Sequence, residues 1–132
     1  MGAIRVDESR FPVIVVTFED TVEDAEFDAY LAQLDAHVAR RIRCAFVFDA
    51  TRAGRTPATQ RRKQADWMKA NEHVLRTYSA GYAFVIESPL VRGALTAILW
   101  LQPMPAPHVV VATFGEAERW ARAQLEDPSR AA

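Results

Sequence analysis

Five side chains with the means to bind or react lie within eight positions of one another. They are Asp49, Thr51, Arg52, Arg55 and Thr56. The carboxylate and the hydroxyls could hold an ion or orient a water, whereas the two planar guanidinium groups favour an anionic partner. A lone carboxylate at the end of a strand more often fixes its own loop by accepting local hydrogen bonds. The cluster therefore favours binding of a phosphate or an acidic side chain over catalysis.

Signatures of the common enzyme classes are missing from the sequence. His37, His73 and His108 are far apart, and the single cysteine, Cys44, has no second cysteine with which to bind zinc. The sequence has no nucleophile elbow, no Walker loop and no Gly-x-Gly-x-x-Gly fingerprint. Cys44 lies within an apolar run, so we expect a small buried hydrophobe. The sequence predicts a protein that is not an enzyme and uses no metal or cofactor.

The polar cluster directly follows a short run that is apolar throughout. Residues 44–48 leave no polar face, so a strand here must be covered on both sides, as in the centre of a parallel sheet. Helical patterns flank this strand at 21–38 and 56–78, which is how a parallel strand is reached and left. The loop 49–56 is therefore predicted at the carboxyl edge of the sheet, where open α/β folds place their sites.

The remaining pattern predicts a layered α/β domain. Threonine and serine next to proline, at Thr56-Pro57 and Ser88-Pro89, indicate capped helix starts, and Thr21 is expected to cap the first helix. The fold class is thus α/β, with a single-layer, mostly parallel sheet of about five strands and four helices. Further strands are expected at 4–7, 11–18, 82–87 and 108–113, and further helices at 90–101 and 115–125.

Length and charge are those of one ordinary globular domain. We expect residues 1–132 to form a single domain with a core at about 11–125 and a frayed tail at 127–132. The net charge of −1, from 16 basic and 17 acidic residues, argues against a nucleic-acid binder. No apolar run approaches the ~20 residues of a membrane span, and the amino terminus does not have the apolar core of a signal peptide. A cytoplasmic location is expected.

The segment 90–101 is too apolar for a helix that covers a sheet on one side only. Arg92 is its only charge. Such a helix is either buried deeply or covered by a partner, because monomers rarely expose a large apolar patch. One expectation is self-association into a homodimer through Leu95, Leu99 and Trp100. The alternative is burial of this helix within the monomer.

Across residues 11–125 the chain resembles the STAS-type domains, and in particular the SpoIIAA-like branch that includes anti-sigma-factor antagonists. The resemblance rests on the order of elements, on Asp49-Ala50-Thr51 where the family has Asp-x-Ser, and on the closing segment from Phe114 to Trp120. In the antagonists a phosphorylatable serine opens the second helix within Asp-Ser-Ser-Gly. Thr56 falls at about that position, but Gly54-Arg55-Thr56-Pro57 replaces the motif.

The resemblance implies a regulatory bacterial signalling module that binds a partner protein through the loop 49–56 and the second helix. An alternative is a domain that binds a small apolar or anionic metabolite beneath the helix at 90–101, with Arg52, Arg55 and helix amides as its polar groups. A closed core beneath that helix would exclude the ligand alternative. An enclosed cavity that reaches Asp49 would weaken the partner-binding hypothesis.

Overall fold

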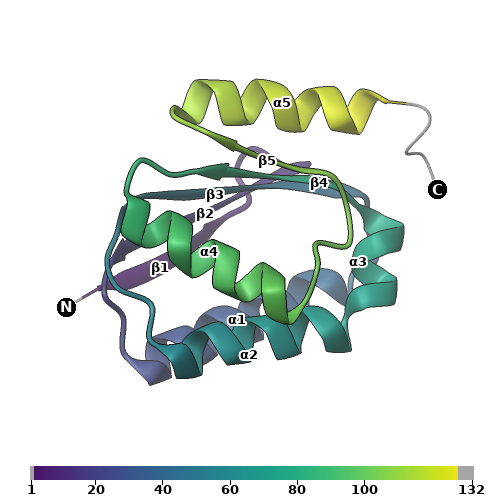
Figure 1. Ribbon diagram of the computed structural model, residues 1–132. Helices are drawn as coiled ribbons and strands as arrows, with labels where there is room; N and C mark the ends of the chain where they lie inside the picture. Colours follow the sequence, from purple (N-terminus) through teal and green to yellow (C-terminus); the bar gives the residue numbers. More distant parts are fainter. Residues whose placement is uncertain (1, 128–132) are drawn as a thin grey trace.

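The computed structural model describes residues 2–127, and they form one sheet with helices on both of its faces (Figure 1). The five strands lie in sequence order, β1 antiparallel to β2 and all later pairs parallel. The predicted α/β class and mostly parallel sheet are confirmed. The elements are β1 (Ala3–Asp7), β2 (Val13–Asp20), α1 (Asp24–Val38), β3 (Cys44–Ala53), α2 (Ala58–Ala70), α3 (Glu72–Tyr78), β4 (Ser79–Val85), α4 (Pro89–Leu101), β5 (His108–Val111) and α5 (Phe114–Glu126).

The strand β3 is central, as its unbroken apolar run predicts. It pairs with β2 on one side and β4 on the other, and its first four residues are buried. All seven residues of β4 are buried as well. Because side chains alternate along a strand, each of these strands supplies one set of apolar side chains to each face of the sheet. The sheet therefore has two separate apolar cores.

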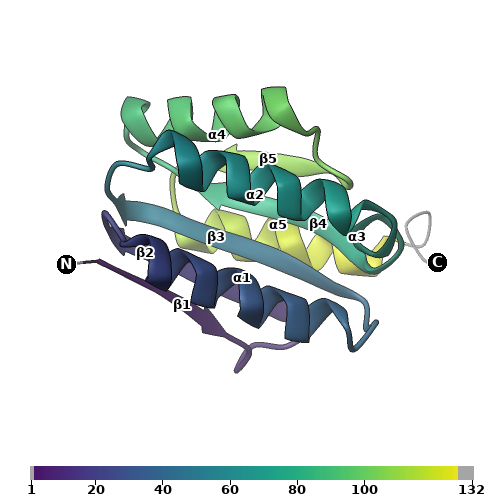
Figure 2. The same ribbon diagram turned by 90° about the horizontal axis from the view of Figure 1, so that it is seen from below.

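The two cores are covered by different numbers of helices. Helices α1 to α4 lie on one face, while α5 alone lies on the other (Figure 1). Figure 2 shows α1, α2 and α4 side by side across the first face. Along α1 the buried side chains Phe27, Tyr30 and Leu34 recur at the predicted spacings of three and four. The first face thus consists of several separate helices whose mutual distances decide how tightly it closes.

One predicted helix is divided in two. The segment expected at 56–78 forms α2 and α3, which meet at Asn71. Asn71 adopts a non-helical backbone conformation, and its side-chain amide donates a hydrogen bond of 2.9 Å to the carbonyl oxygen of Trp67. The Asn71 backbone N–H donates to the same oxygen at 3.1 Å, so Asn71 closes the last turn of α2 with both its backbone and its side chain. Residues 2–127 therefore contain five helices, so the expected number of four was wrong.

Two predicted helix caps were also wrong. Thr56 lies one position before the cap of α2: Pro57 is the capping residue, with an extended ψ of 156°, and no side chain caps this helix. Thr21 does not cap α1 either, because that helix begins at Asp24. At α4, by contrast, the hydroxyl oxygen of Ser88 accepts a hydrogen bond from the backbone N–H of Leu90 at 3.2 Å, as predicted.

The last helix begins with a reciprocal cap. The hydroxyl of Thr113 accepts a hydrogen bond from the Glu116 backbone N–H at 3.2 Å and donates one to the Glu116 carboxylate at 3.0 Å. Within residues 2–127, no helix is both long enough and apolar enough to cross a bilayer. The frayed tail expected at 127–132 lies, apart from Asp127, outside the described residues.

Candidate functional site

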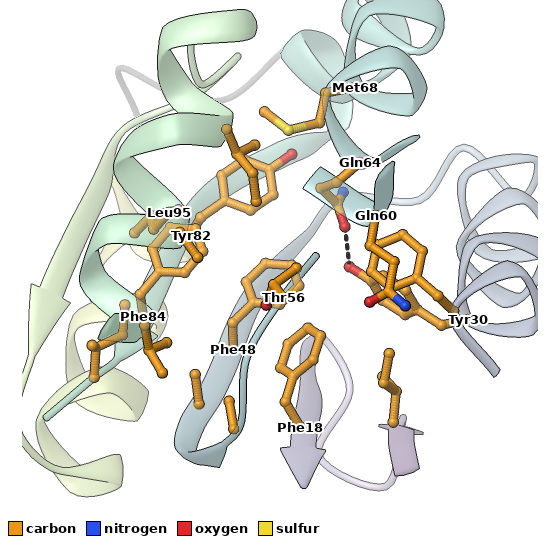
Figure 3. A pocket seen from close by; sticks show the side chains of 18 of the residues that line it. Phe18, Tyr30, Phe48, Thr56, Gln60, Gln64, Met68, Tyr82, Phe84 and Leu95 are labelled. Atoms are coloured by element: carbon orange, nitrogen blue, oxygen red, sulfur yellow. Dashed lines mark hydrogen bonds between the residues drawn. The ribbon is translucent and has the colours of Figure 1, made fainter. Parts of the chain in front are cut away.

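A cavity of about 130 Å³ lies between the sheet and the helices α1, α2 and α4 (Figure 3). Most of the side chains around it are aromatic or aliphatic, and the few polar ones come mainly from α2 and from the loop before it. The core beneath α4 is therefore not closed. This observation keeps the ligand alternative, which a closed core would have excluded.

Aromatic side chains from neighbouring strands form the sheet side of the cavity. Phe46 pairs in register with Tyr82, and Phe48 with Phe84. The rings of each pair are almost parallel, with centroids 5.3 Å and 5.2 Å apart and interplanar angles of 8° and 13°. Phe18 of β2 extends the row, 6.1 Å from the Phe48 ring. Residues two apart on a strand share a face, so this aromatic row follows from the alternation in β3 and β4.

Helix α4 covers the cavity only loosely. Val91 is its only fully buried residue, while Leu95 and Leu99 are half-buried and line the cavity. Trp100 points to solvent and is 86% exposed. Of the residues expected to mediate self-association, two therefore face inward and one faces outward. Full burial of α4 within the monomer, the alternative expectation, is not what the structure shows.

The polar end of the cavity is built from α1 and α2. The hydroxyl of Tyr30 donates a hydrogen bond of 2.9 Å to the Gln64 side-chain oxygen (Figure 3). Burial raises the pKa of Tyr30 well above its usual value, so the phenol stays neutral and keeps its proton. Gln60, one turn earlier on α2, is only 2% exposed, and its amide nitrogen donates to Val22 and Asp24. These polar groups hold α1 and α2 together beside a mostly apolar space, which Asp20, Arg55 and Thr56 also line.

The structure separates the predicted loop residues. Phe48 and Ala50 line the cavity, so Asp49 and Thr51, which alternate with them on β3, belong to the opposite face. The Asp49 carboxylate accepts hydrogen bonds from the Thr51 backbone N–H at 3.2 Å and from its hydroxyl at 2.8 Å. This is the local loop-fixing role described above for a carboxylate at a strand end. The cavity is thus lined by both sequence neighbours of Asp49 but not by Asp49 itself.

The two arginines of the loop also differ in their surroundings. Arg52 forms an ion pair of 2.9 Å with Glu19. Arg55 lines the cavity near Thr56, and its guanidinium group has no partner among residues 2–127. Its backbone N–H donates to the Thr21 hydroxyl at 3.0 Å, which fixes the loop in place. Of the five predicted residues, only Arg55 and Thr56 line the cavity.

A buried histidine and cysteine form a second polar contact near the far end of α1. The His37 Nε2 and Cys44 Sγ atoms are 3.3 Å apart. Burial raises the pKa of the Cys44 thiol to about 12, and burial is also the main reason that the pKa of His37 is lowered. Both groups are therefore neutral near pH 7, and the thiol is not activated as a nucleophile. In the described part of the chain, no three His, Cys, Asp or Glu residues gather as metal ligands would.

Sequence reasoning missed the cavity-lining residues of α1 and α2. Tyr30 was assigned to the inner stripe of its helix, while Gln60 and Gln64 were given no role. A signal was present: the two glutamines precede Met68 at intervals of four, so they continue the inward face of α2. Polar residues on a buried stripe mark a polar contact or a site. That pattern could have drawn attention to them.

Solved structures of known fold resemble this chain over nearly its whole length. An uncharacterized protein of the DUF3478 family with a SpoIIAA-like fold, from Shewanella loihica, superposes with a TM-score of 0.67 over 91% of this chain and 93% of its own, at 11% identity. An anti-sigma factor antagonist from Mycobacterium paratuberculosis gives a TM-score of 0.63 over 92% and 95%, at 17% identity. This chain has a SpoIIAA-like fold. The resemblance expected from residues 11–125 is confirmed at the level of the fold.

The sequence alone does not lead to a named relative. No protein-family model matches it, and a comparison with curated proteins found no match. At identities of 11% and 17%, the SpoIIAA-like fold is what the solved structures share with this chain. Function must therefore be argued from the cavity and its surroundings.

Proposed function

We propose that this SpoIIAA-like domain is a non-catalytic regulatory module that binds a small apolar molecule in the cavity beneath α4. The observation that carries the proposal is the cavity itself, an apolar space beside a row of aromatic rings. Ligand sites are typically concave and apolar, with a few polar groups that fix orientation. Tyr30, Gln60 and Gln64 have the right place and number for that role.

The volume limits the size of the occupant. A cavity of about 150 Å³ lined by aliphatic and aromatic side chains accommodates benzene. Sites for drug-sized molecules usually measure about 300–1,000 Å³. The 130 Å³ of this cavity fit a single ring or a short branched chain. A larger molecule would require α4 to move away from the sheet.

The groups around the cavity support binding over catalysis. Tyr30 and Tyr82 line it, and burial raises the pKa of both phenols, so neither ionises near neutral pH. The Tyr82 hydroxyl is engaged with the Ser79 hydroxyl at 2.8 Å. Asp49, the carboxylate singled out in the sequence, is engaged with Thr51 outside the cavity. We infer that the cavity holds a ligand without transforming it.

Toluene is a suitable first probe because it has the size of one ring and no polar group. We expect saturable binding to the wild-type protein by ligand-observed NMR. Ala94→Phe places a ring in the cavity and should abolish binding, because Ala94 lines the cavity from α4. Thr96→Phe adds the same ring on the exposed side of α4 and should leave binding unchanged. Equal binding to both variants would contradict the proposal, as would a wild type that binds neither toluene nor its hydroxyl analogue phenol.

A second candidate function is binding of a partner protein through the loop 49–56 and the exposed side of α2. It is favoured by the similarity to a protein described as an anti-sigma factor antagonist. It is also favoured by Arg55, whose guanidinium group has no partner among residues 2–127. Arg55 lies just before α2, where backbone amides and the helix dipole also favour an anionic group. An acidic side chain or a phosphate on the partner would fit this chemistry.

Arg52→Ala with Arg55→Ala tests this surface. Arg52 forms only an exposed ion pair, worth about 0–1 kcal/mol, so the folded state should persist. Partner capture from the native host, read by mass spectrometry, should weaken. Arg122→Ala on α5 is the control, because it removes an exposed arginine, paired with Glu118, from the opposite side of the sheet. Undiminished capture by the double variant would remove the loop from consideration.

Self-association through α4 remains a separate proposal. Its support is the exposed apolar surface of Leu90, Trp100 and Leu101, since soluble monomers seldom expose several large apolar side chains on one helix. We expect Trp100→Glu to remain folded and to lower the dimer fraction in sedimentation. A wild type that sediments as a monomer at all concentrations would end this proposal.

A further inference from the structure

The orientation of one buried amide on α2 is fixed by its neighbours. Gln60 is only 2% exposed. Its Nε2 atom donates hydrogen bonds to the Val22 carbonyl oxygen at 2.9 Å and to a carboxylate oxygen of Asp24 at 3.0 Å. Both partners can only accept, so the amide cannot be flipped without placing oxygen against oxygen. The position of the Gln60 oxygen is therefore determined as well.

That oxygen faces the cavity and is not engaged by the protein. Gln60 lines the cavity, and Figure 3 shows its oxygen on the cavity side and its nitrogen on the far side. Among residues 2–127, no hydrogen bond reaches the Gln60 oxygen. The Tyr30 hydroxyl, which also lines the cavity, donates its hydrogen bond to the side-chain oxygen of Gln64 and not to Gln60. The oxygen is open to the cavity, so an apolar ligand would bury it without a donor, at a cost, whereas a ligand that supplies the donor avoids that cost and gains affinity.

We propose that the cavity is selective for an uncharged, ring-sized molecule with one hydroxyl or N–H donor, directed at the side-chain oxygen of Gln60. Phenol belongs to this class. The inference rests on the proposed ligand-binding function and narrows it. The aromatic rings of Phe18 and Phe48 would contact the apolar body of the ligand, and Gln60 would receive its proton donor.

The same geometry disfavours an anionic ligand group at this end of the cavity. A carboxylate or phosphate beside the Gln60 oxygen would place one hydrogen-bond acceptor against another. The negatively charged Asp24 carboxylate is also close, because it accepts a hydrogen bond from the nitrogen of the same Gln60 amide. Like partial charges repel more strongly in an apolar environment than in water. Arg55, the cation of this region, lines the cavity from the loop before α2, so an anionic group would be drawn toward that loop and not toward the Gln60 oxygen. The part of the cavity beside Gln60 and the part beside the loop are thus suited to different chemical groups.

Phenol and toluene form the matched pair for a test, because they differ only in a hydroxyl against a methyl group. In a cavity without an acceptor, phenol would bind more weakly, since its hydroxyl would lose its hydrogen bonds to water. With the Gln60 oxygen as acceptor we expect phenol to bind about tenfold or more tightly than toluene in wild-type protein by titration calorimetry. Benzoate should bind more weakly than either.

Gln60→Met keeps a side chain of similar length without the acceptor oxygen, so the preference for phenol should disappear while toluene still binds. Leu95→Met is the control, because it reshapes the cavity lining without altering its polarity and should change both affinities by the same factor. If the Gln60 variant does not fold, intermolecular NOEs from phenol to Gln60 in the wild type locate the ring directly.

The outcomes separate the two proposals. If neither phenol nor toluene binds the wild type, the proposed function fails and this inference fails with it. If toluene binds as tightly as phenol or more tightly, the cavity binds apolar molecules and only the inference is overturned. A preference for phenol that survives in Gln60→Met, or NOEs that place phenol away from Gln60, would show that another group is the acceptor.

Discussion

The two faces of the sheet are both apolar, yet one is closed and the other is not. On the face covered by α5, the strands contribute alanines and valines, and α5 contributes Ala117 and Ala121, all buried. On the face covered by α1, α2 and α4, the strands contribute large rings, and a cavity remains. Apolar composition therefore does not decide closure. The difference lies in how near the covering helices can come to the strands.

Small side chains bring α5 against the sheet. Gly81 of β4 shows the fit: a Cβ atom added there would lie 2.8 Å from the ring carbons of Trp120. On the other face, the strands carry bulky aromatic side chains. There α4 packs chiefly against the neighbouring helix α2 and less against the sheet. Its inward residues, such as Leu95, stay half-buried because the rings below do not fill the space. The same sheet is thus tightly covered by α5 on one face and loosely covered by α4 on the other.

The largest expected effect comes from a single methyl group on the closed face. Gly81→Ala should lower the free energy of unfolding by about 1–3 kcal/mol, because the Trp120 ring has to shift to admit the new carbon. Chemical denaturation followed by circular dichroism measures this loss.

Gly93→Ala on α4 is the matched control for that change. A Cβ atom there meets nothing within 4 Å, and alanine favours a helix over glycine by about 0.5–1 kcal/mol. The same substitution should therefore stabilise the protein at position 93. A loss of similar size at both positions would mean that the two faces do not differ as described.

A smaller effect of opposite sign is expected from filling the cavity. Ala94→Leu adds apolar volume where α4 faces the open space and should raise the free energy of unfolding by about 0.5–2 kcal/mol. Ala83→Leu, on the closed face where Ala83 is fully buried, should be destabilising by overpacking. Thermal unfolding of the two variants compares the faces directly, and a destabilised Ala94→Leu would indicate that the cavity closes in solution.

The smallest effect is expected at the far end of α1, where His37 packs against the ring of Phe46 on the open face. Burial is the main cause of its lowered pKa, which the carboxylate of Glu8, 3.6 Å from Nδ1, partly opposes. Since the unfolded chain then binds the proton more readily, the free energy of unfolding should fall as pH drops below about 6.5. The slope cannot exceed about 1.4 kcal/mol per pH unit for one group.

His37→Phe provides the control for the titration, since it keeps an aromatic ring next to Phe46 and removes the ionisable group. Urea denaturation between pH 5 and pH 7.5 should show the fall in wild type and a flatter profile in the variant. Identical profiles in the two proteins would assign the pH dependence to other residues.

The sequence by itself determined the elements and their order. The apolar run 44–48 identified the central strand, Ser88-Pro89 identified the start of α4, and the order of elements led to the SpoIIAA-like fold. These features depend on residues within one or two turns of each other, so local pattern is enough to predict them. The break at Asn71 and the cap at Pro57 were missed because a short local hydrogen bond and one backbone angle decided them.

The site was decided by the tertiary structure. The sequence placed Asp49, Thr51, Arg52, Arg55 and Thr56 together, but strand alternation turned Asp49 and Thr51 to the opposite face from the cavity, and Glu19 engaged Arg52. The cavity depends on how far α4 stands from aromatic rings on β3 and β4, and on an amide whose partners lie 36 and 38 residues away. The distance between α4 and the strands results from the sizes of many side chains on separate elements. A local sequence pattern does not contain that information.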